Sequence, residues 1–240
     1  MNRQTVDSAN QTVGEIVAKN YQAASVFRKY GIDFCCGGGV SLQYICKKKG
    51  VDLGEITNEL EQTMREMGDI PDSFNAWEPT FLIDYIIDTH HTFVRTKIPE
   101  ILAYAQKVAK VYGDSHPENR EIAARFEVLS KELMDHMEDE EEVVFPQIRS
   151  IYERRKRGVK ISDKELNALR DGLNEMEEDH DGAGAVMAEI RALSNQYNPP
   201  ESACTTYRIL YKNLESFEEN LHKHVHLENN ILFKKALSLS

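Results

Sequence analysis

The chain has 240 residues, of which 41% are hydrophobic and 29% are charged, a balance typical of a folded protein rather than a disordered one. Its formal net charge of −11 argues against nucleic acid or an anionic membrane as a partner. No apolar run approaches the roughly 18 residues that a membrane-spanning helix needs, so we expect no membrane association.

Two features predict a cytoplasmic location. The first ten residues, MNRQTVDSAN, contain no apolar segment typical of a secretory signal peptide. The four cysteines, Cys35, Cys36, Cys46 and Cys204, lack the spacing of a disulfide scaffold. We therefore expect thiols kept reduced in the cytoplasm.

Residues 1–68 are predicted to form a small helical domain. Apolar residues at helical spacing in VGEIVAKN and YQAASVFRKY predict two short helices. Ser41 is a predicted N-cap, and Gly50 a predicted C-terminal stop, for a third helix. Asp52 is predicted to cap a fourth helix. Residues 69–78, which include a proline, then form a predicted linker.

Residues 79–240 are predicted to form four long helices. Their predicted bounds are about 79–112, from 117 past 145, 162–195, and from 201 nearly to the C-terminus. Pro146 is expected to kink or end the second helix. Helices of roughly 30 residues joined by short loops are typical of an up-down four-helix bundle, so the predicted fold class is all-α.

The histidines of these helices form a pattern of their own. His136 precedes Glu140 by four residues, and His224 precedes Glu228 by four. Four residues make about one helical turn, so each pair projects from one face of its helix toward one point. Either pair alone could arise by chance on an acidic helix. Two such pairs on different helices, each followed by an apolar turn, are unlikely to be accidental and indicate a functional site.

Adding one histidine from each of the other two helices, His91 and His180, gives four imidazoles and two carboxylates. Nitrogen and oxygen donors in this ratio favour iron or another transition metal over calcium or magnesium. Carboxylates can bridge two metals, so the donor set predicts a di-iron site in the bundle.

The remaining histidines and acidic residues receive ordinary interpretations. His222 and His226 lie four apart but share no carboxylate in register, so we interpret them as solvated or as neighbours of the ligands. His90 must face about a quarter-turn away from His91. The acidic residues around Glu140 are interpreted as a solvated face: Asp139, Glu141 and Glu142.

Other types of site are poorly supported by the sequence. A ferritin-like centre needs two Glu-x-x-His units, and only Glu177 to His180 supplies one. The chain has no G-x-S-x-G motif for a serine nucleophile. The glycines after Cys36 are not followed by G-K-[ST], so they do not make a phosphate loop.

The stretch DFCCGGG contains two adjacent cysteines, Cys35 and Cys36. Their α-carbons are closer than ordinary disulfide geometry allows, so a bond between them would be strained and easily reduced. The spacing is also not C-x-x-C, which argues against a thioredoxin motif or a zinc knuckle.

Taken together, the motifs resemble the iron–sulfur cluster repair di-iron proteins, also called the repair of iron centres family. The resemblance extends from about Thr12 to Leu237 and rests on FRKYGIDFCCGG, DHMEDEEEVVFP, EMEEDHDGAG, PPESACTTY and HVHLENNILF. It implies an ScdA-type N-terminal domain joined to a haemerythrin-like bundle. The iron ligands that it implies are His91, His136, Glu140, His180, His224 and Glu228, with the two glutamates as bridges.

One position departs from the family pattern. Similar proteins carry another ligand histidine at the end of the first long helix, where this chain has Tyr112. Three alternatives stay open at this point. Tyr112 could face the iron, His116 could take the position, or the iron could be five-coordinate or bind a water there.

The resemblance also implies a reactive role for Cys35 and Cys36. Ser41 begins a helix just after the glycines, and thiols near a helix N-terminus are stabilised as thiolates. We expect this loop to exchange iron, electrons or nitric oxide with a partner or with the di-iron site. The alternative is a buried pair that serves packing. Cys46 and Cys204 are assigned no role.

The expected function is repair of iron–sulfur clusters damaged by oxidative or nitrosative stress, with damaged iron–sulfur proteins as iron recipients. The alternatives are a di-iron nitric oxide reductase, a haemerythrin-like sensor that binds O2 or NO, and a metal-free helical interaction protein. Whether the protein is an enzyme is left open by the sequence. The N-terminal part could pair two chains into a homodimer.

Overall fold

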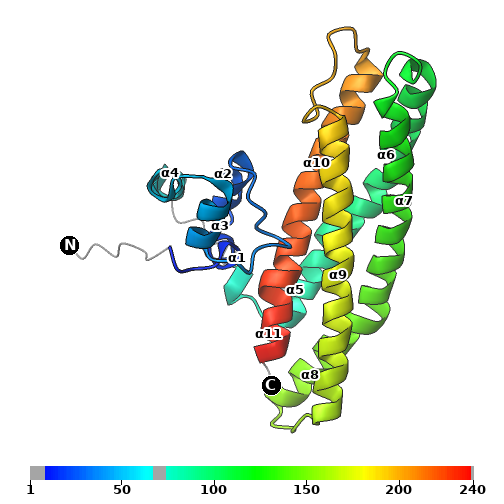
Figure 1. The fold of residues 1–240 in the computed structure, drawn as a ribbon. Coiled ribbons are helices and arrows are strands. Elements are labelled where there is room, and N and C mark those ends of the chain that lie inside the picture. The colour runs from blue at the N-terminus through cyan, green and yellow to red at the C-terminus, as the bar shows by residue number, and fades with distance from the viewer. Residues whose placement is uncertain (1–8, 67–73, 239–240) are drawn as a thin grey trace. The chain divides into compact units, whose positions relative to one another are not determined.

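The computed structural model describes residues 9–66 and 74–238 (Figure 1). These residues divide into two compact units. The N-terminal unit runs to Glu78 and also contains Val225–Ser238, and the bundle unit comprises Pro79–His224. Part of the expected linker, residues 67–73, and most of the stretch tested for a signal peptide, residues 1–8, lie outside the described residues. The division at 1–68, 69–78 and 79–240 stays a prediction.

Short helices make up the N-terminal unit before Glu78. They are α1 (Val13–Lys19), α2 (Ala23–Lys29), α3 (Leu42–Lys49), α4 (Leu53–Glu66) and the 3₁₀ turn η1 (Phe74–Ala76). The predicted caps are confirmed. The Ser41 side chain accepts a hydrogen bond from the Tyr44 amide, and Asp52 accepts one from the Glu55 amide. Gly50 ends α3 with a φ of 69°, a left-handed conformation that favours glycine.

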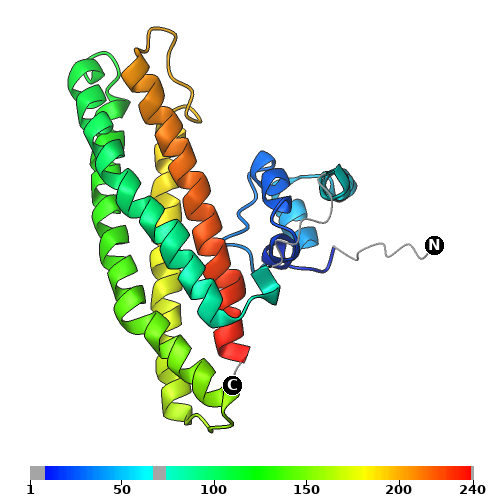
Figure 2. The ribbon, with the colours of Figure 1, turned by 180° about the vertical axis from the view of Figure 1, so that it is seen from behind.

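The bundle unit contains the four longest described helices together with shorter segments. They are α5 (Pro79–Tyr85), η2 (Ile86–His91), α6 (Thr92–Tyr112), α7 (Glu118–Asp139), η3 (Glu140–Val144), α8 (Phe145–Lys156), α9 (Asp163–Leu193) and α10 (Thr205–Leu227). The last helix continues through η4 (Glu228–Leu232) into α11 (Phe233–Ser238). In both views α6, α7, α9 and α10 run side by side (Figure 1, Figure 2). No strand occurs in residues 9–66 and 74–238, so the all-α prediction is confirmed.

Aromatic side chains fill the interior of the bundle unit. The ring of Phe217 on α10 contacts Phe126 on α7 with centroids 5.2 Å apart, and it contacts Phe93 on α6 at 6.3 Å. Phe126 and Phe217 are both fully buried. Burying one such side chain contributes about 1.5–3 kcal/mol, so these rings bring three helices together and fix the faces they turn inward.

The helix ends follow the predicted signals closely. Ser162 and Glu165 form a capping box at the start of α9, where the third long helix is predicted to begin. The helix predicted to begin at residue 117 begins one residue later, with Pro117 as the N-cap of α7, and Pro146 lies in the first turn of α8. The sequence did not predict η2, η3 and η4, which are π-helical turns. None of the described helices is long and apolar enough to cross a membrane.

Candidate metal centre

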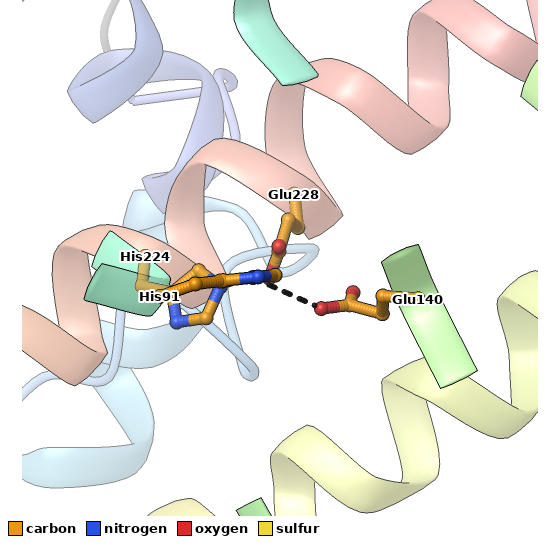
Figure 3. A group of neighbouring side chains, drawn as sticks. All are labelled: His91, Glu140, His224 and Glu228. Atoms are coloured by element: carbon orange, nitrogen blue, oxygen red, sulfur yellow. Dashed lines mark hydrogen bonds and ion pairs between the residues drawn. The ribbon is translucent and has the colours of Figure 1, made fainter. Parts of the chain in front are cut away.

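All six predicted ligands gather into two overlapping groups of buried side chains. One group contains His91, Glu140, His224 and Glu228; the other contains His136, Glu140 and His180. Within each group the candidate ligand atoms lie within 4.8 Å of one another. Figure 3 shows Glu140 pointing toward the other three members of the first group, with a dashed line to His91. Glu140 belongs to both groups, which is the place that a bridging carboxylate would take.

Three of the six side chains lie at the edges of π-helical turns. His91 is the last residue of η2, Glu140 is the first of η3, and Glu228 is the first of η4. A π-turn holds one more residue than an α-turn and is found most often at functional sites. The turns therefore re-aim the helix beyond each of these residues while His136 and His224 stay one α-turn upstream of their glutamates.

The imidazoles meet in pairs through the same ring atom. Nε2 of His91 lies 3.1 Å from Nε2 of His224, and Nε2 of His136 lies 3.0 Å from Nε2 of His180. Each pair thus directs two nitrogens at one point, together with an oxygen of Glu140. Imidazole nitrogens and carboxylate oxygens converging in this way are the donor set of transition-metal sites.

Carboxylates hold the other ring nitrogen of two of these histidines. Nδ1 of His91 lies 2.6 Å from a carboxylate oxygen of Glu141, and Nδ1 of His136 lies 3.1 Å from Asp179. A carboxylate at Nδ1 favours the tautomer that carries its proton there, which leaves the Nε2 lone pair for a metal.

The prediction that Glu141 belongs to a solvated acidic face is wrong. Its side chain is 26% exposed and also accepts a hydrogen bond from Arg95 at 2.8 Å. Burial alone would raise the pKa of Glu141, but the hydrogen bonds with Arg95 and His91 outweigh it and lower the pKa. The contact leaves no α-helical signal in the sequence, because Glu141 lies inside a π-turn, whose faces an α-helical pattern does not describe. The contact between Asp179 and His136 joins two helices and leaves no spacing signal.

The surroundings of the Glu140 carboxylate indicate whether these residues fit a metal. Its side chain is fully buried, with one oxygen 3.3 Å from Nε2 of His91 and 3.6 Å from Nε2 of His136. Among the described residues, none donates a hydrogen bond to either of its carboxylate oxygens. A buried carboxylate without donors is costly, and a cation between the two imidazole pairs would compensate it. The residues therefore fit a metal.

Of the two interpretations of His226, the solvated one is wrong, and the one that makes it a neighbour of the ligands stays a prediction. His226 is buried, and its ring contacts Phe34 at 5.9 Å and Tyr21 at 6.0 Å. Burial lowers the pKa of this imidazole to about 4. His90 is also buried, with Nδ1 3.2 Å from the side-chain oxygen of Asn220 and its ring stacked on His224.

Tyr112 and His116 lie away from the ligands. Tyr112 ends α6, about 30 Å along the helix from His91 at roughly 1.5 Å per residue. Its ring lies 5.2 Å from the ring of Tyr207 and 6.5 Å from that of His116. His116 belongs to neither of the two buried groups. Both protein alternatives for an additional ligand are therefore wrong.

The two adjacent cysteines lie in a loop organised by Asp33. One oxygen of Asp33 accepts hydrogen bonds from the amides of Cys35 and Cys36, and the other accepts one from the amide of Gly37. The same carboxylate lies 3.2 Å from Sγ of Cys35, and the two sulfurs are 3.7 Å apart. Asp33, Cys35 and Cys36 thus form a third group with metal-ligand atoms in reach of one another.

The surroundings of Cys35 favour the neutral thiol, not the expected thiolate. This cysteine is buried, whereas Cys36 is partly exposed. The hydrogen bond with Cys36, burial and the Asp33 carboxylate all raise the pKa of the Cys35 thiol. The expected effect of the following helix is outweighed because an anionic neighbour and loss of water both favour the neutral thiol. Cys35 therefore needs a base or a metal to lose its proton.

Comparisons with known proteins agree with this architecture. The hemerythrin HHE cation binding domain matches residues 82–236, and ScdA_N, a domain of unknown function, matches residues 9–64. The chain is 34% identical over 225 residues to the iron-sulfur cluster repair protein ScdA of Staphylococcus haemolyticus, covering 93% of this chain and 96% of that protein. It is 33% identical over 235 residues to the iron-sulfur cluster repair protein YtfE of Yersinia pseudotuberculosis, covering 97% and 99%. YtfE of Yersinia pestis matches over the same length and identity.

The chain belongs to the ScdA and YtfE family of iron–sulfur cluster repair proteins. The resemblance inferred from the motifs is confirmed, and so is the haemerythrin-like bundle, since the HHE domain match spans it. The buried histidine and glutamate groups and the cation binding domain together fit a metal centre.

Proposed function

We propose that this protein repairs damaged iron–sulfur clusters by donating iron from the histidine and carboxylate site. The observation that carries the proposal is the pair of buried ligand groups that share Glu140, in a chain whose relatives are iron–sulfur cluster repair proteins. The recipients would be iron–sulfur proteins that have lost iron under oxidative or nitrosative stress, in the cytoplasm.

The ligand groups support a content of two irons per chain. His91, His224 and Glu228 would hold one ion, and His136 and His180 would hold the other. Glu140 would bridge the two, with Glu228 as a second bridge. Iron is the cargo in this proposal. Histidine and carboxylate ligands suit a donor because protonation weakens them, so the site can release what it holds.

Cys35 and Cys36 would be the reactive residues that pass iron onward. A thiol must lose its proton to become a ligand, so an iron ion taken up by the pair would displace the thiol protons to water. The partial exposure of Cys36 would let a recipient's ligand reach the pair. Nitric oxide and O2 remain proposed small ligands, and a homodimer remains a proposed assembly.

The first experiment measures iron content after anaerobic expression. The wild type should carry about two irons per chain, and Glu140→Ala combined with Glu228→Ala should carry almost none. Glu142→Ala removes an exposed carboxylate from the same π-turn and should leave the iron content unchanged, which makes it the matched control. Equal iron in the wild type and the double variant would contradict the ligand assignment.

The second experiment measures repair. Iron-loaded wild type should restore activity to a cluster-depleted dehydratase in the presence of sulfide and a thiol reductant, and the double variant should not. Restoration by the double variant as fast as by the wild type would sink the proposal. Nitrous oxide formed from nitric oxide over many turnovers, without any restoration, would instead favour a nitric oxide reductase.

A further inference from the structure

The end of the last helix presents two different sets of contacts. His224 and Glu228 lie four residues apart and belong to one ligand group. His226 and Asn230 also lie four apart, and both are buried. His226 follows His224 by two residues, which is about 200° of rotation on an α-helix, so its side chain lies on the opposite face. Asn230 lies inside the π-turn η4, and its direction is given by its contacts.

Asn230 contacts the loop that carries the two cysteines. Its side-chain amide donates a hydrogen bond of 2.9 Å to the carbonyl of Cys35 and one of 3.4 Å to the carbonyl of Phe34. Its side-chain oxygen accepts a hydrogen bond of 3.4 Å from Nζ of Lys234. Asn230 therefore joins the backbone of the thiol loop to η4, the π-turn that begins with Glu228.

Two glycines make this contact possible. The amide of Gly14 donates a hydrogen bond of 2.8 Å to the carbonyl of Gly38, which closes the thiol loop against α1. A β-carbon at Gly14 would overlap the carboxamide of Asn230, and one at Gly38 would lie 3.1 Å from its oxygen. The side chain of Asn230 thus fills a space that only glycine leaves at both positions.

His226 supports the same loop one turn earlier. Its ring contacts Phe34, the residue before Cys35, and both side chains are almost completely buried. The loop is therefore attached to this helix by packing at His226 and by hydrogen bonds at Asn230. Asp33 holds the loop's own shape, so its attachment and its internal order come from different residues.

We propose that Asn230 is a positioning residue that fastens the thiol loop to the π-turn carrying Glu228, so that metal binding at Glu228 restrains the loop and limits access to Cys35 and Cys36. The two residues are two positions apart in one five-residue turn. A metal held by Glu228 restrains that turn, and release of the metal frees it. The coupling is reciprocal, so opening the loop would weaken metal binding by the same factor.

The test measures how fast each cysteine reacts with an aromatic disulfide, with the modified residues located by mass spectrometry. Asn230→Asp keeps the size of the side chain but removes the amide donor. Losing the amide that donates both hydrogen bonds should speed the reaction of Cys36 at least about fivefold in metal-free protein, the factor expected for a single bond. Cys204, which is exposed and distant in sequence, serves as the internal reference and should react at an unchanged rate.

The matched control is Asn75→Asp. The Asn75 side chain also donates one hydrogen bond to a backbone carbonyl in the same unit, at 2.9 Å to Ala18, but it does not contact the thiol loop. This variant should react as the wild type does. Equal rates for Cys36 in Asn230→Asp and wild type, or an equal acceleration in Asn75→Asp, would overturn the assignment.

The second arm adds ferrous iron. Iron should slow the reaction of Cys36 in the wild type and have little effect in Asn230→Asp, which should still bind iron because all six ligands remain. An equal slowing in both proteins would overturn the coupling. If Asn230→Asp does not fold, hydrogen exchange in the wild type decides the question. Iron should slow exchange of the loop amides from Cys35 to Gly38, and unchanged exchange would refute the proposal.

The coupling rests on the proposed function, but different experimental results would refute the proposed function and the positioning role of Asn230. A wild type that binds no iron would refute the proposed function and the coupling. The metal-free comparison of Asn230→Asp with Asn75→Asp would still decide whether Asn230 positions the loop.

Discussion

Glu141 is the side chain outside the ligand set whose effect on the metal site is most easily isolated. It lies 2.6 Å from Nδ1 of His91 and is itself held by Arg95. Carboxylates in this position fix the tautomer and orientation of a ligating histidine, and their loss commonly weakens metal binding about 10–100-fold. We expect Glu141→Ala to lower iron affinity by that factor while the fold persists.

The measurement is competition for ferrous iron with a chelator of known affinity, under anaerobic conditions. Glu142→Ala is the control, because Glu142 is exposed and adjacent to Glu141 in sequence. Equal affinities in the two variants would show that Glu141 does not orient His91.

Some site residues could be predicted from the sequence and others could not. The His-x-x-x-Glu pairs at His136 and His224 were found because their spacing lies within regular α-helix, where four residues return to the same face. Glu141 was misassigned because it follows the start of a π-turn. His226 was misassigned because contacts with Tyr21 and Phe34, far away in sequence, bury it. The periodicity of one segment reveals neither a π-turn nor contacts with distant residues.

At the scale of elements, the helix boundaries were predictable wherever a cap supplied the signal. Ser41 and Asp52 cap the helices assigned to them, and Ser162 caps the helix predicted to begin there, because their side chains satisfy amides that a helix start leaves open. The π-turns had no such signal. They depend on the balance of packing along a whole helix rather than on one residue type.

The start of α9 gives an element whose stability should depend on pH. Hydrogen bonds from Arg154 and from Ser162 lower the pKa of Glu165 from its ordinary value of 4.5 to about 2. A carboxyl whose folded pKa is depressed stabilises the fold above its unfolded pKa, and that contribution disappears as the pH falls through the folded value. We expect Glu165→Gln to destabilise metal-free protein at pH 7 and to have progressively less effect between about pH 4.5 and 2.

Urea unfolding of the two proteins across this range measures the difference. Glu153→Gln is a suitable comparison, because Glu153 lies in α8 and its ion pair with Arg157 is long, at 3.9 Å. A penalty for Glu165→Gln that stays constant from pH 7 to pH 3 would contradict the role given to this carboxylate.

At the scale of the whole molecule, metal and fold should be linked. Glu140 is buried without hydrogen-bond donors among the described residues, so the metal-free bundle bears a cost that a cation would relieve. A ligand that binds only the folded state stabilises it by about 2.7 kcal/mol at a free concentration of 100 times its Kd. We expect ferrous iron to raise the midpoint of thermal unfolding of the wild type by several degrees.

Calorimetry under anaerobic conditions measures this shift. Glu140→Ala should show almost no shift with iron, and its metal-free form should be at least as stable as metal-free wild type because the buried charge is gone. If iron does not change the midpoint of thermal unfolding of the wild type, the expected link between metal binding and fold stability is wrong.

The π-turns also limit which insertions and deletions the sequence can tolerate. Each turn holds one residue more than an ordinary helical turn, and His91, Glu140 and Glu228 lie at the three edges. Deleting one residue there would leave a continuous helix but rotate everything beyond it by about 100°. A change that an alignment records as one missing letter would thus turn an entire helix end away from its partners. Length at these three points should be more constrained than the identity of the exposed residues within them.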